Sequence, residues 1–175
     1  KHASEFEVLQ NRKQAGFISR YMSIDNCRVL EVGAGAGAFL EFFHTEYHCE
    51  VFFDEHSKEA REIMLSKGVL NDFNDAVHSK PIDLVVLRHV LEHIFDLRTF
   101  MANVRNVSSL NGYVFIEVPD WSNFDSSTDP LIFEHLNQFN TYSLVVLLTR
   151  LGWQIEALEK SIDPDDPATP NRVQR

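Results

Sequence analysis

The amino-acid sequence predicts an α/β fold: a doubly wound, mostly parallel sheet with helices on both faces. Apolar runs of strand length alternate with segments of helical spacing along most of the 175 residues. The runs are continuous in apolar residues, as expected of parallel strands that are covered on both sides. Several of them end in glycine, acid or histidine, so these polar candidates should gather beyond the carboxyl ends of the strands, where such sheets bind ligands.

The first strand and the turn after it give the strongest signal. Residues 28–32 form the strand, Gly33, Gly35 and Gly37 follow at every second position, and helical spacing resumes at Ala38. Glycine lacks the Cβ atom that would keep a ligand off the backbone, and it permits the positive φ that a tight turn needs. A strand, a glycine loop and a helix in this order predict a site where a nucleotide-like ligand lies on the main chain.

Two classes of ligand use such a loop. The spacing also fits the dinucleotide fingerprint, in which a pyrophosphate lies on the helix N-terminus. Glu31 stands two residues before the first glycine, where its carboxylate would repel a pyrophosphate but suits a ligand with an ammonium and a sulfonium. Residues 31–37, Glu-Val-Gly-Ala-Gly-Ala-Gly, resemble the first motif of the class I S-adenosylmethionine (SAM) dependent methyltransferases. The resemblance extends over about residues 29–158 and implies their Rossmann-like fold, with SAM as cofactor and S-adenosylhomocysteine as product.

Composition favours one domain at residues 1–160, followed by a polar, proline-containing tail at residues 161–175. With 44% apolar residues the chain can bury a sizeable core. Sixteen basic and twenty-six acidic residues give a net charge of −10, which disfavours nucleic acid and anionic membranes as partners. No apolar run approaches the ~20 residues that cross a bilayer. Cys27 and Cys49 are expected as buried reduced thiols, so we expect a cytoplasmic protein. The resemblance implies that its partner is a small-molecule acceptor.

The second strand is expected at residues 49–53 and leads into Asp54. Asp54 lies 21 residues after the first glycine, where an acid at the tip of the next strand can accept hydrogen bonds from both ribose hydroxyls. The resembling methyltransferases place their ribose-binding acid there too, and Glu55 is the neighbouring alternative. Ser57 should cap the next helix, which stops at Gly68.

A third short strand at Val69–Leu70 should lead to a possible adenine site. By the resemblance, Asp72 or Asn71 would bond the adenine amino group and Phe73 would pack on the ring. Surface Asx-turn chemistry is an equal explanation of these residues.

The fourth strand, at residues 82–87, runs into Arg88 and His89. In the resembling methyltransferases the backbone after this strand holds the methionine moiety, which makes both residues candidates for cofactor binding. His89, Glu92 and His93 also match the inverted zinc-peptidase motif. That motif needs a helix to set both histidines on one face, whereas this one follows a strand, so no metal is expected.

The remaining elements follow from the same patterns. They are one or two helices within residues 4–21, a helix at 96–107, a turn at Asn111–Gly112, a strand at 113–118, a loop at 120–130, a helix from a Thr141 cap to Leu151, and a strand at 153–158. The seventh strand of the family is not evident.

The candidates for catalysis are His135, Glu134 and His93. Residues 133–140 resemble a segment of the group that includes small-molecule and sugar methyltransferases. We expect His135, more than His89 or His93, to be the base that takes the acceptor's proton, since histidine titrates near neutrality. Glu134 would tune that imidazole if the backbone turns there. The alternative is that His135 only tethers the segment to the next helix.

The expected function is transfer of a methyl group from SAM to oxygen or carbon of a small molecule, such as a sugar or a secondary metabolite. A nicotinamide-dependent oxidoreductase built on the same glycine loop is one alternative. A catalytically inactive methyltransferase-like binding module is another, because a fold alone does not establish activity.

Overall fold

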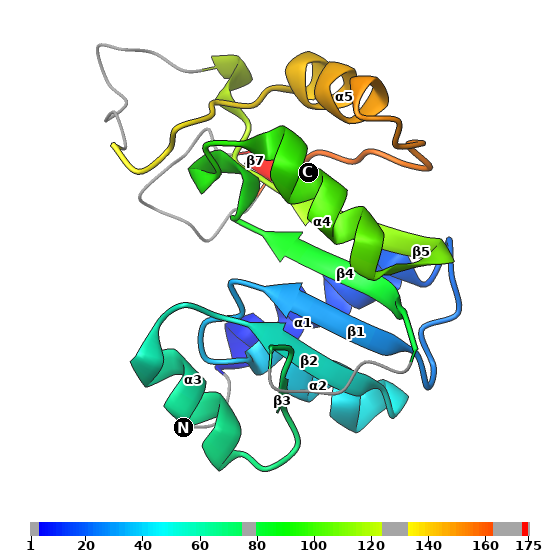
Figure 1. Ribbon diagram of the computed structural model, residues 1–175, viewed down its shortest axis with the longest axis vertical. Coiled ribbons are helices and arrows are strands. Elements are labelled where there is room, and N and C mark those ends of the chain that lie inside the picture. Colours follow the sequence, from blue (N-terminus) through cyan, green and yellow to red (C-terminus); the bar gives the residue numbers. More distant parts are fainter. Residues whose placement is uncertain (1–3, 75–79, 124–132, 163–172, 175) are drawn as a thin grey trace. The chain divides into compact units, whose positions relative to one another are not determined.

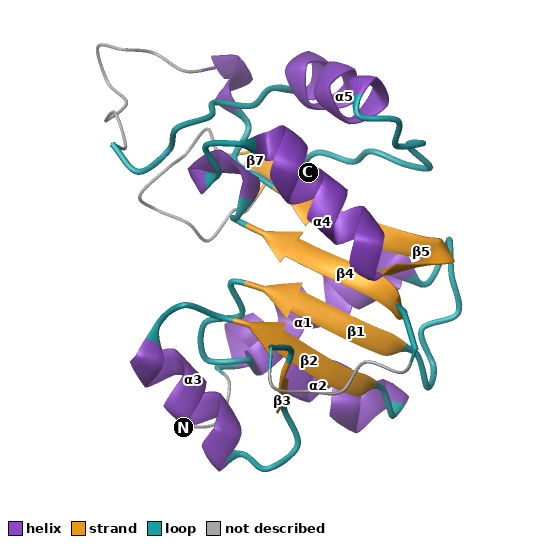
Figure 2. Ribbon diagram, viewed as in Figure 1, coloured by secondary structure: helices purple, strands orange, loops and turns teal. Residues whose placement is uncertain are grey.

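The computed structural model describes residues 4–74, 80–123, 133–162 and 173–174 (Figure 1). Five strands form one sheet in the order β3-β2-β1-β4-β5, and β6 and β7 form a separate antiparallel pair. The strands are β1 Arg28–Val32, β2 Glu50–Asp54, β3 Asn71–Asp72, β4 Ile82–Arg88, β5 Ser108–Glu117, β6 Ser161–Ile162 and β7 Val173–Gln174. The helices are α1 Glu5–Ile18, α2 Ala38–Tyr47, α3 Lys58–Ser66, α4 Leu97–Val107 and α5 Thr141–Arg150, with 3-10 turns η1 Leu91–His93 and η2 Trp121–Asn123 (Figure 2). The predicted α/β class is confirmed.

The chain folds as two compact units. The first consists of Lys1–Leu87 and Val104–Phe115, and the second of Arg88–Asn103 and Ile116–Arg175. The expected boundary between a domain and a tail at residue 160 stays a prediction.

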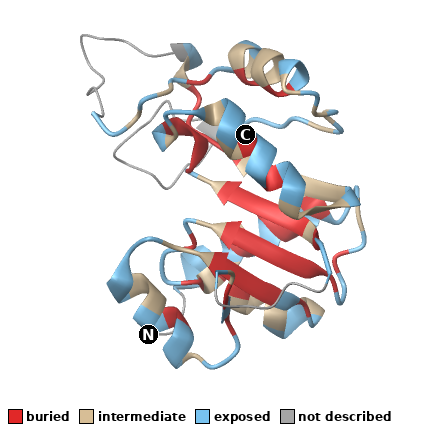
Figure 3. Ribbon diagram, in the orientation of Figure 1, coloured by how far each residue is buried: buried red, intermediate tan, exposed pale blue. Residues whose placement is uncertain are grey.

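Strand β1 is the centre of the first unit's sheet. It pairs in parallel with β2 on one side and with β4 on the other, and β2 pairs in parallel with the short β3. These central strands are buried along most of their length (Figure 3). Side chains from α1, α2 and α3 join those of the sheet in one apolar core. Burial of the central strands explains why their sequences are continuous in apolar residues instead of alternating.

The helix ends follow the expected capping chemistry, with one correction. Ser57 caps α3, because its hydroxyl accepts a hydrogen bond from the Ala60 N–H at 3.3 Å. The cap of α5 is Asn140, so the prediction of Thr141 was wrong by one residue. The Asn140 amide oxygen accepts from the Ser143 N–H at 2.9 Å, and the Ser143 hydroxyl accepts from the Asn140 N–H at 3.0 Å. Thr141 is instead the first helical residue.

The third strand is two residues later than predicted. Residues 71–72 pair with β2, and the Phe73 N–H then donates to the Phe53 carbonyl at 2.8 Å. Leu70 is buried in the core instead of pairing. The strand therefore contains the polar residues Asn71 and Asp72, which the sequence placed after the strand. They are strand residues because their backbones pair with Phe52 and Phe53 of β2, whatever the polarity of their side chains.

Two further predictions in the carboxyl-terminal half were wrong. Strand β5 begins at Ser108, so Gly112 lies within a strand and not in a turn. A Cβ on Gly112 would lie 3.1 Å from the Ile82 carbonyl oxygen, so glycine lets the backbone pass closely there. Residues 153–158 alternate in exposure as a strand would, yet no described strand pairs with them and they have no regular structure. Alternation alone does not make a strand without a neighbour to accept its hydrogen bonds.

The two cysteines are buried free thiols, as predicted. Their sulfur atoms lie 3.5 Å apart, and both thiols donate to the Ile24 carbonyl, at 3.2 Å from Cys27 and 3.0 Å from Cys49. The loop that was expected at residues 120–130 lies partly outside the described residues, which include η2 but not 124–132. In the part of the chain that is described, no helix is both long and apolar enough to cross a bilayer.

Candidate functional site

The turn after β1 is built from three glycines in left-handed conformation. Gly33, Gly35 and Gly37 have φ values of 68°, 54° and 73°. A Cβ atom added at Gly35 would meet nothing within 4 Å, so the main chain is open to a ligand there. A Cβ at Gly37 would lie 2.6 Å from Leu70 Cδ1 and 2.9 Å from Met64 Cγ. Gly35 thus provides access to the backbone, whereas Gly37 lets the loop pack on the core.

Two acids stand at the carboxyl ends of β1 and β2 beside this loop. Glu31 is only 1% exposed. The parallel register pairs Val32 with Asp54, and the Gly33 N–H donates to the Asp54 carbonyl at 2.8 Å. The Asp54 carboxylate is half-buried and accepts from the Asn74 amide at 3.2 Å. The fold therefore brings Glu31, the glycine loop and Asp54 together, as their spacing predicted.

Glu55 has a larger part in this loop than the sequence indicated. Its Oε2 accepts from the Gly35 N–H at 2.9 Å, and its Oε1 accepts from the Ser57 N–H at 2.8 Å. One carboxylate thus ties the middle of the glycine loop to the start of α3. The sequence offered Glu55 only as an alternative ribose acid, since its position next to a strand tip does not reveal which way it points.

The three candidates for adenine binding are partly engaged by the protein itself. The Asp72 carboxylate is buried, pairs with Arg61 and accepts from the Asn74 N–H at 2.9 Å. That last contact is the Asx-type turn considered as the alternative. Asn71 is exposed but donates its amide to the Val51 carbonyl at 3.0 Å. Phe73 is half-buried, and the adenine roles of all three stay predictions.

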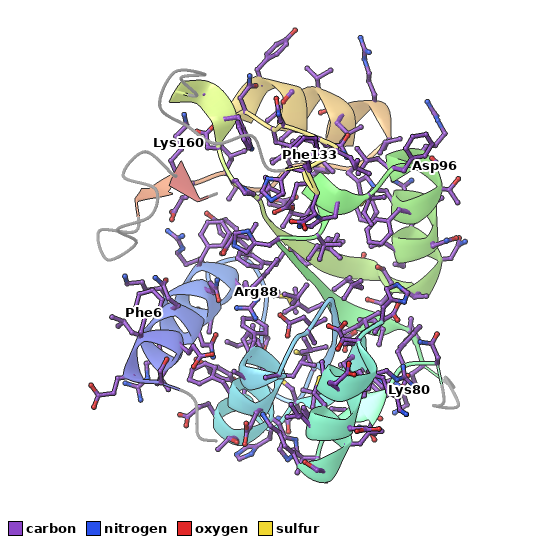
Figure 4. The ribbon with its side chains drawn as sticks, turned by 90° about the vertical axis from the view of Figure 1, so that its left-hand side faces the viewer. Phe6, Lys80, Arg88, Asp96, Phe133 and Lys160 are labelled. Atoms are coloured by element: carbon purple, nitrogen blue, oxygen red, sulfur yellow. The ribbon has the colours of Figure 1, made fainter. Side chains whose placement is uncertain are left out.

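In the second unit, His89 is held between two carboxylates. It follows Arg88, the last residue of β4, which Figure 4 labels. His89 takes a left-handed φ of 53°. Its Nδ1 lies 3.3 Å from Glu92 Oε1, and its Nε2 lies 3.3 Å from Glu117 Oε1. Hydrogen bonding to Glu117, and then to Glu92, raises the pKa of His89 to about 9. At neutral pH both ring nitrogens carry protons, so His89 has no lone pair with which to act as a base.

The rings of the other two candidate histidines, His93 and His135, are in edge-to-face contact. His93, in η1, has its Nδ1 2.8 Å from the Glu134 carbonyl oxygen. Because a carbonyl only accepts, Nδ1 of His93 carries the proton of this hydrogen bond. The ring centroids of His93 and His135 are 4.9 Å apart at 76°, and Trp121 lies edge-on to His135 at 6.1 Å. Glu134, which is exposed, contributes its main chain to this contact.

Glu92, His93 and His135 each bring one possible ligand atom within 4.8 Å of the others. A carboxylate and two imidazoles are ligands that zinc accepts. His89 lies against the buried Glu92 carboxylate, with its Nδ1 3.3 Å from Glu92 Oε1. The expectation that no metal binds here stays a prediction. The zinc-peptidase pattern of the sequence consists of His89, Glu92 and His93, whereas the three residues that lie close together are Glu92, His93 and His135.

Comparison with known proteins gives a consistent picture. A family model described as a methyltransferase domain matches residues 7–158. No curated protein matches the sequence significantly. A solved structure of a SAM dependent methyltransferase from Archaeoglobus fulgidus is 22% identical with a TM-score of 0.63, over 85% of this chain and 69% of that one.

Two further structures share the fold. A plantazolicin methyltransferase in complex with an analogue and S-adenosylhomocysteine is 15% identical with a TM-score of 0.66, over 83% of this chain and 62% of that one. Phosphoethanolamine N-methyltransferase 2 from Haemonchus contortus, in complex with SAM, is 16% identical with a TM-score of 0.63, over 81% and 36%. The chain thus spans between 36% and 69% of these three proteins.

Proposed function

Because the chain belongs to the methyltransferase domain family, whose cofactor is S-adenosylmethionine, we propose that it methylates oxygen or carbon of a small molecule. The observation that carries the proposal is the open backbone at Gly35 between Glu31 and Asp54. A left-handed glycine without a neighbour at its Cβ position accommodates a ligand against the main chain. Two carboxylates beside it suit a ligand that combines positive charge with hydroxyl groups. A sugar or a secondary metabolite is the class of acceptor that we propose.

We assign most of the cofactor's parts to residues of the first unit. Glu31 would meet the positive charge of the methionine moiety, the backbone of Gly33, Gly35 and Gly37 would lie along the ligand, and Asp54 would accept from both ribose hydroxyls. Asn71 and Phe73 are better placed for the adenine than Asp72, whose carboxylate already serves Arg61 and Asn74. Arg88 and His89 belong to the second unit, and their contact with the methionine end stays a prediction of the family resemblance.

The reaction needs little chemistry from the protein. When bound, the cofactor supplies an electrophilic methyl group, which forms a bond to the acceptor as its bond to sulfur breaks. The protein aligns the reactants, and alignment alone accounts for much of the rate in such a displacement. An acceptor hydroxyl or acidic carbon must also lose a proton. We propose that an imidazole nitrogen of His135 takes it, with His93 beside it, because His89 is already protonated at neutral pH.

Calorimetric titration tests the cofactor. We expect saturable binding of SAM and S-adenosylhomocysteine and none of NAD. Saturable NAD binding with no heat from either sulfur compound would replace the methyltransferase with the oxidoreductase. Binding of SAM without turnover over a broad acceptor panel would support the inactive binding module instead.

Asp54→Ala tests the ribose contact. We expect cofactor binding to weaken by about 1.5–3 kcal/mol, the range for hydrogen bonds to a charged group. Glu55→Gln is the matched control, because it changes the neighbouring acid and keeps an oxygen that can accept from the Gly35 N–H. A loss of less than twofold in Asp54→Ala would refute the assignment, and a larger loss in Glu55→Gln would transfer it to Glu55.

His135→Ala tests the base. We expect kcat to fall by about 10²–10⁴-fold while the cofactor Kd is unchanged. The wild-type rate should rise with pH through the histidine pKa. A variant that keeps kcat but raises the acceptor KM would show that His135 positions the acceptor without taking its proton.

A further inference from the structure

Asn137 joins two segments of the second unit that are far apart in sequence. Its main-chain N–H donates to the Glu92 carbonyl at 3.0 Å. Both protons of its side-chain amide are also used, one to the Leu91 carbonyl at 3.1 Å and one to the Ile94 carbonyl at 2.7 Å. Asn137 therefore binds the carbonyl groups of Leu91 and Glu92 in the η1 turn and of Ile94, the residue that ends it.

Over its described residues, the segment that Asn137 anchors has no regular structure of its own; another of its backbone ties is the Phe139 carbonyl, which accepts from the Trp121 N–H at 2.8 Å. The described part before α5, residues 133–140, contains neither helix nor strand (Figure 2). It begins at Phe133, whose side chain is 97% exposed (Figure 4). A chain without its own hydrogen-bonded ladder takes its position from side-chain anchors such as this one.

The same contact region carries the two histidines. His93 is next to Glu92, whose carbonyl Asn137 binds, and His135 precedes Asn137 by two residues. A fourth hydrogen bond, from His93 Nδ1 to the Glu134 carbonyl, closes the region from the other side. The 4.9 Å distance between the imidazole rings is therefore set by bonds to the backbone on both segments.

We propose that Asn137 is a positioning residue whose three hydrogen bonds to the η1 turn hold His135 against His93 in the arrangement needed for proton transfer. This inference rests on the proposed function, because it concerns the base of that reaction. A displacement of about 1 Å at a reacting group costs roughly 10²-fold in rate. Loss of the amide bonds should accordingly act on kcat, and not on the affinity for the cofactor, whose proposed residues are mostly in the first unit.

Three substitutions test the geometry. Asn137→Ala removes the two side-chain bonds and keeps the main-chain bond, and Asn137→Asp also places a carboxylate against two carbonyl oxygens. Asn140→Asp is the matched control, because the same chemical change three residues away keeps the acceptor that caps α5. We expect kcat to fall by about 10–100-fold in both Asn137 variants, with an unchanged SAM Kd, and to stay near wild type in Asn140→Asp. Equal kcat in Asn137→Ala and wild type would overturn the proposal.

A double-substitution cycle separates positioning from a general structural effect. If Asn137 acts through His135, Asn137→Ala should cost almost nothing further in a protein that already carries His135→Ala. The same fold-loss in both backgrounds would show that Asn137 only supports the fold.

A spectroscopic measurement keeps the test independent of turnover. In ¹⁵N-labelled protein, the His93 ring should show one fixed tautomer with its proton on Nδ1, and Asn137→Ala should convert it to an average of both tautomers. Asn140→Asp should leave the spectrum unchanged. If no acceptor is methylated, the proposed function fails, but the tautomer measurement still tests whether Asn137 orders the histidines. A fixed His93 tautomer in Asn137→Ala would refute the positioning role of Asn137.

Discussion

Replacement of Gly37 by alanine should destabilise the first unit much more than the same change at Gly35. Both glycines have a positive φ, 73° and 54°. An L-residue pays about 1–2 kcal/mol in this conformation. The two sites differ only in their surroundings, because the new Cβ meets Leu70 and Met64 at Gly37 and nothing within 4 Å at Gly35.

The magnitude follows from the packing around Gly37. Contacts of 2.6 Å and 2.9 Å are shorter than carbon atoms allow, so Leu70 or Met64 must move. Leu70 is 4% exposed and Met64 is fully buried, and overpacking of such a core costs about 1–3 kcal/mol. Added to the backbone cost, this gives a loss of about 2–5 kcal/mol for Gly37→Ala and about 1–2 kcal/mol for Gly35→Ala.

Urea unfolding followed by circular dichroism measures both free energies of unfolding. The slope with denaturant should be the same in the two variants and the wild type, so that the midpoints report stability. Binding of SAM tests the ligand contact at Gly35, because Gly35→Val should abolish binding while the unit stays folded. Equal destabilisation at the two glycines would refute the packing described for Gly37, and an unchanged SAM Kd in Gly35→Val would show that the loop does not contact the ligand.

Two other substitutions probe buried charge. Arg61→Met leaves the Asp72 carboxylate, whose side chain is 2% exposed, without its cationic partner, and should lower the unfolding free energy by about 3 kcal/mol; stability within 0.5 kcal/mol of wild type in urea would contradict this. The raised pKa of His89 predicts a pH dependence, because its stabilising effect is complete below the unfolded-state value of 6.5 and is lost as pH rises through about 9. His89→Gln should remove that part of the decline between pH 6.5 and 9 in thermal or urea unfolding, and an identical decline in variant and wild type would show that the ion pairs with Glu92 and Glu117 do not form.

Local patterns in the sequence were sufficient for the glycine loop and the elements beside it. The glycine loop, the acid at the tip of β2 and the serine that caps α3 are each encoded within a few residues, and the structure places them as expected. Continuous apolar runs also identified β1, β2 and β4, because a parallel strand covered on both faces leaves no polar alternation. The fold class follows from these features, and the cofactor follows from the resemblance of residues 31–37 to the first motif of the family.

Strand pairing was decided by the tertiary structure. Residues 71–72 join the sheet in place of their apolar neighbours, and residues 153–158 alternate without pairing to any described strand. Neither outcome can be read from hydrophobicity, since a strand exists only where another backbone meets its hydrogen-bonding groups.

The histidine site also depends on contacts over long separations. His89 appeared in sequence as one of three candidate bases, but Glu117 and Glu92 make it a cation. His93 and His135 meet because Asn137 binds the η1 turn across more than 40 residues of sequence. The sequence determines which residues can exchange a proton or bind a nucleotide. Which of them do so together is decided only when the chain folds, because a charge on a neighbour or a hydrogen bond to a distant carbonyl changes the protonation and the orientation of the same side chain.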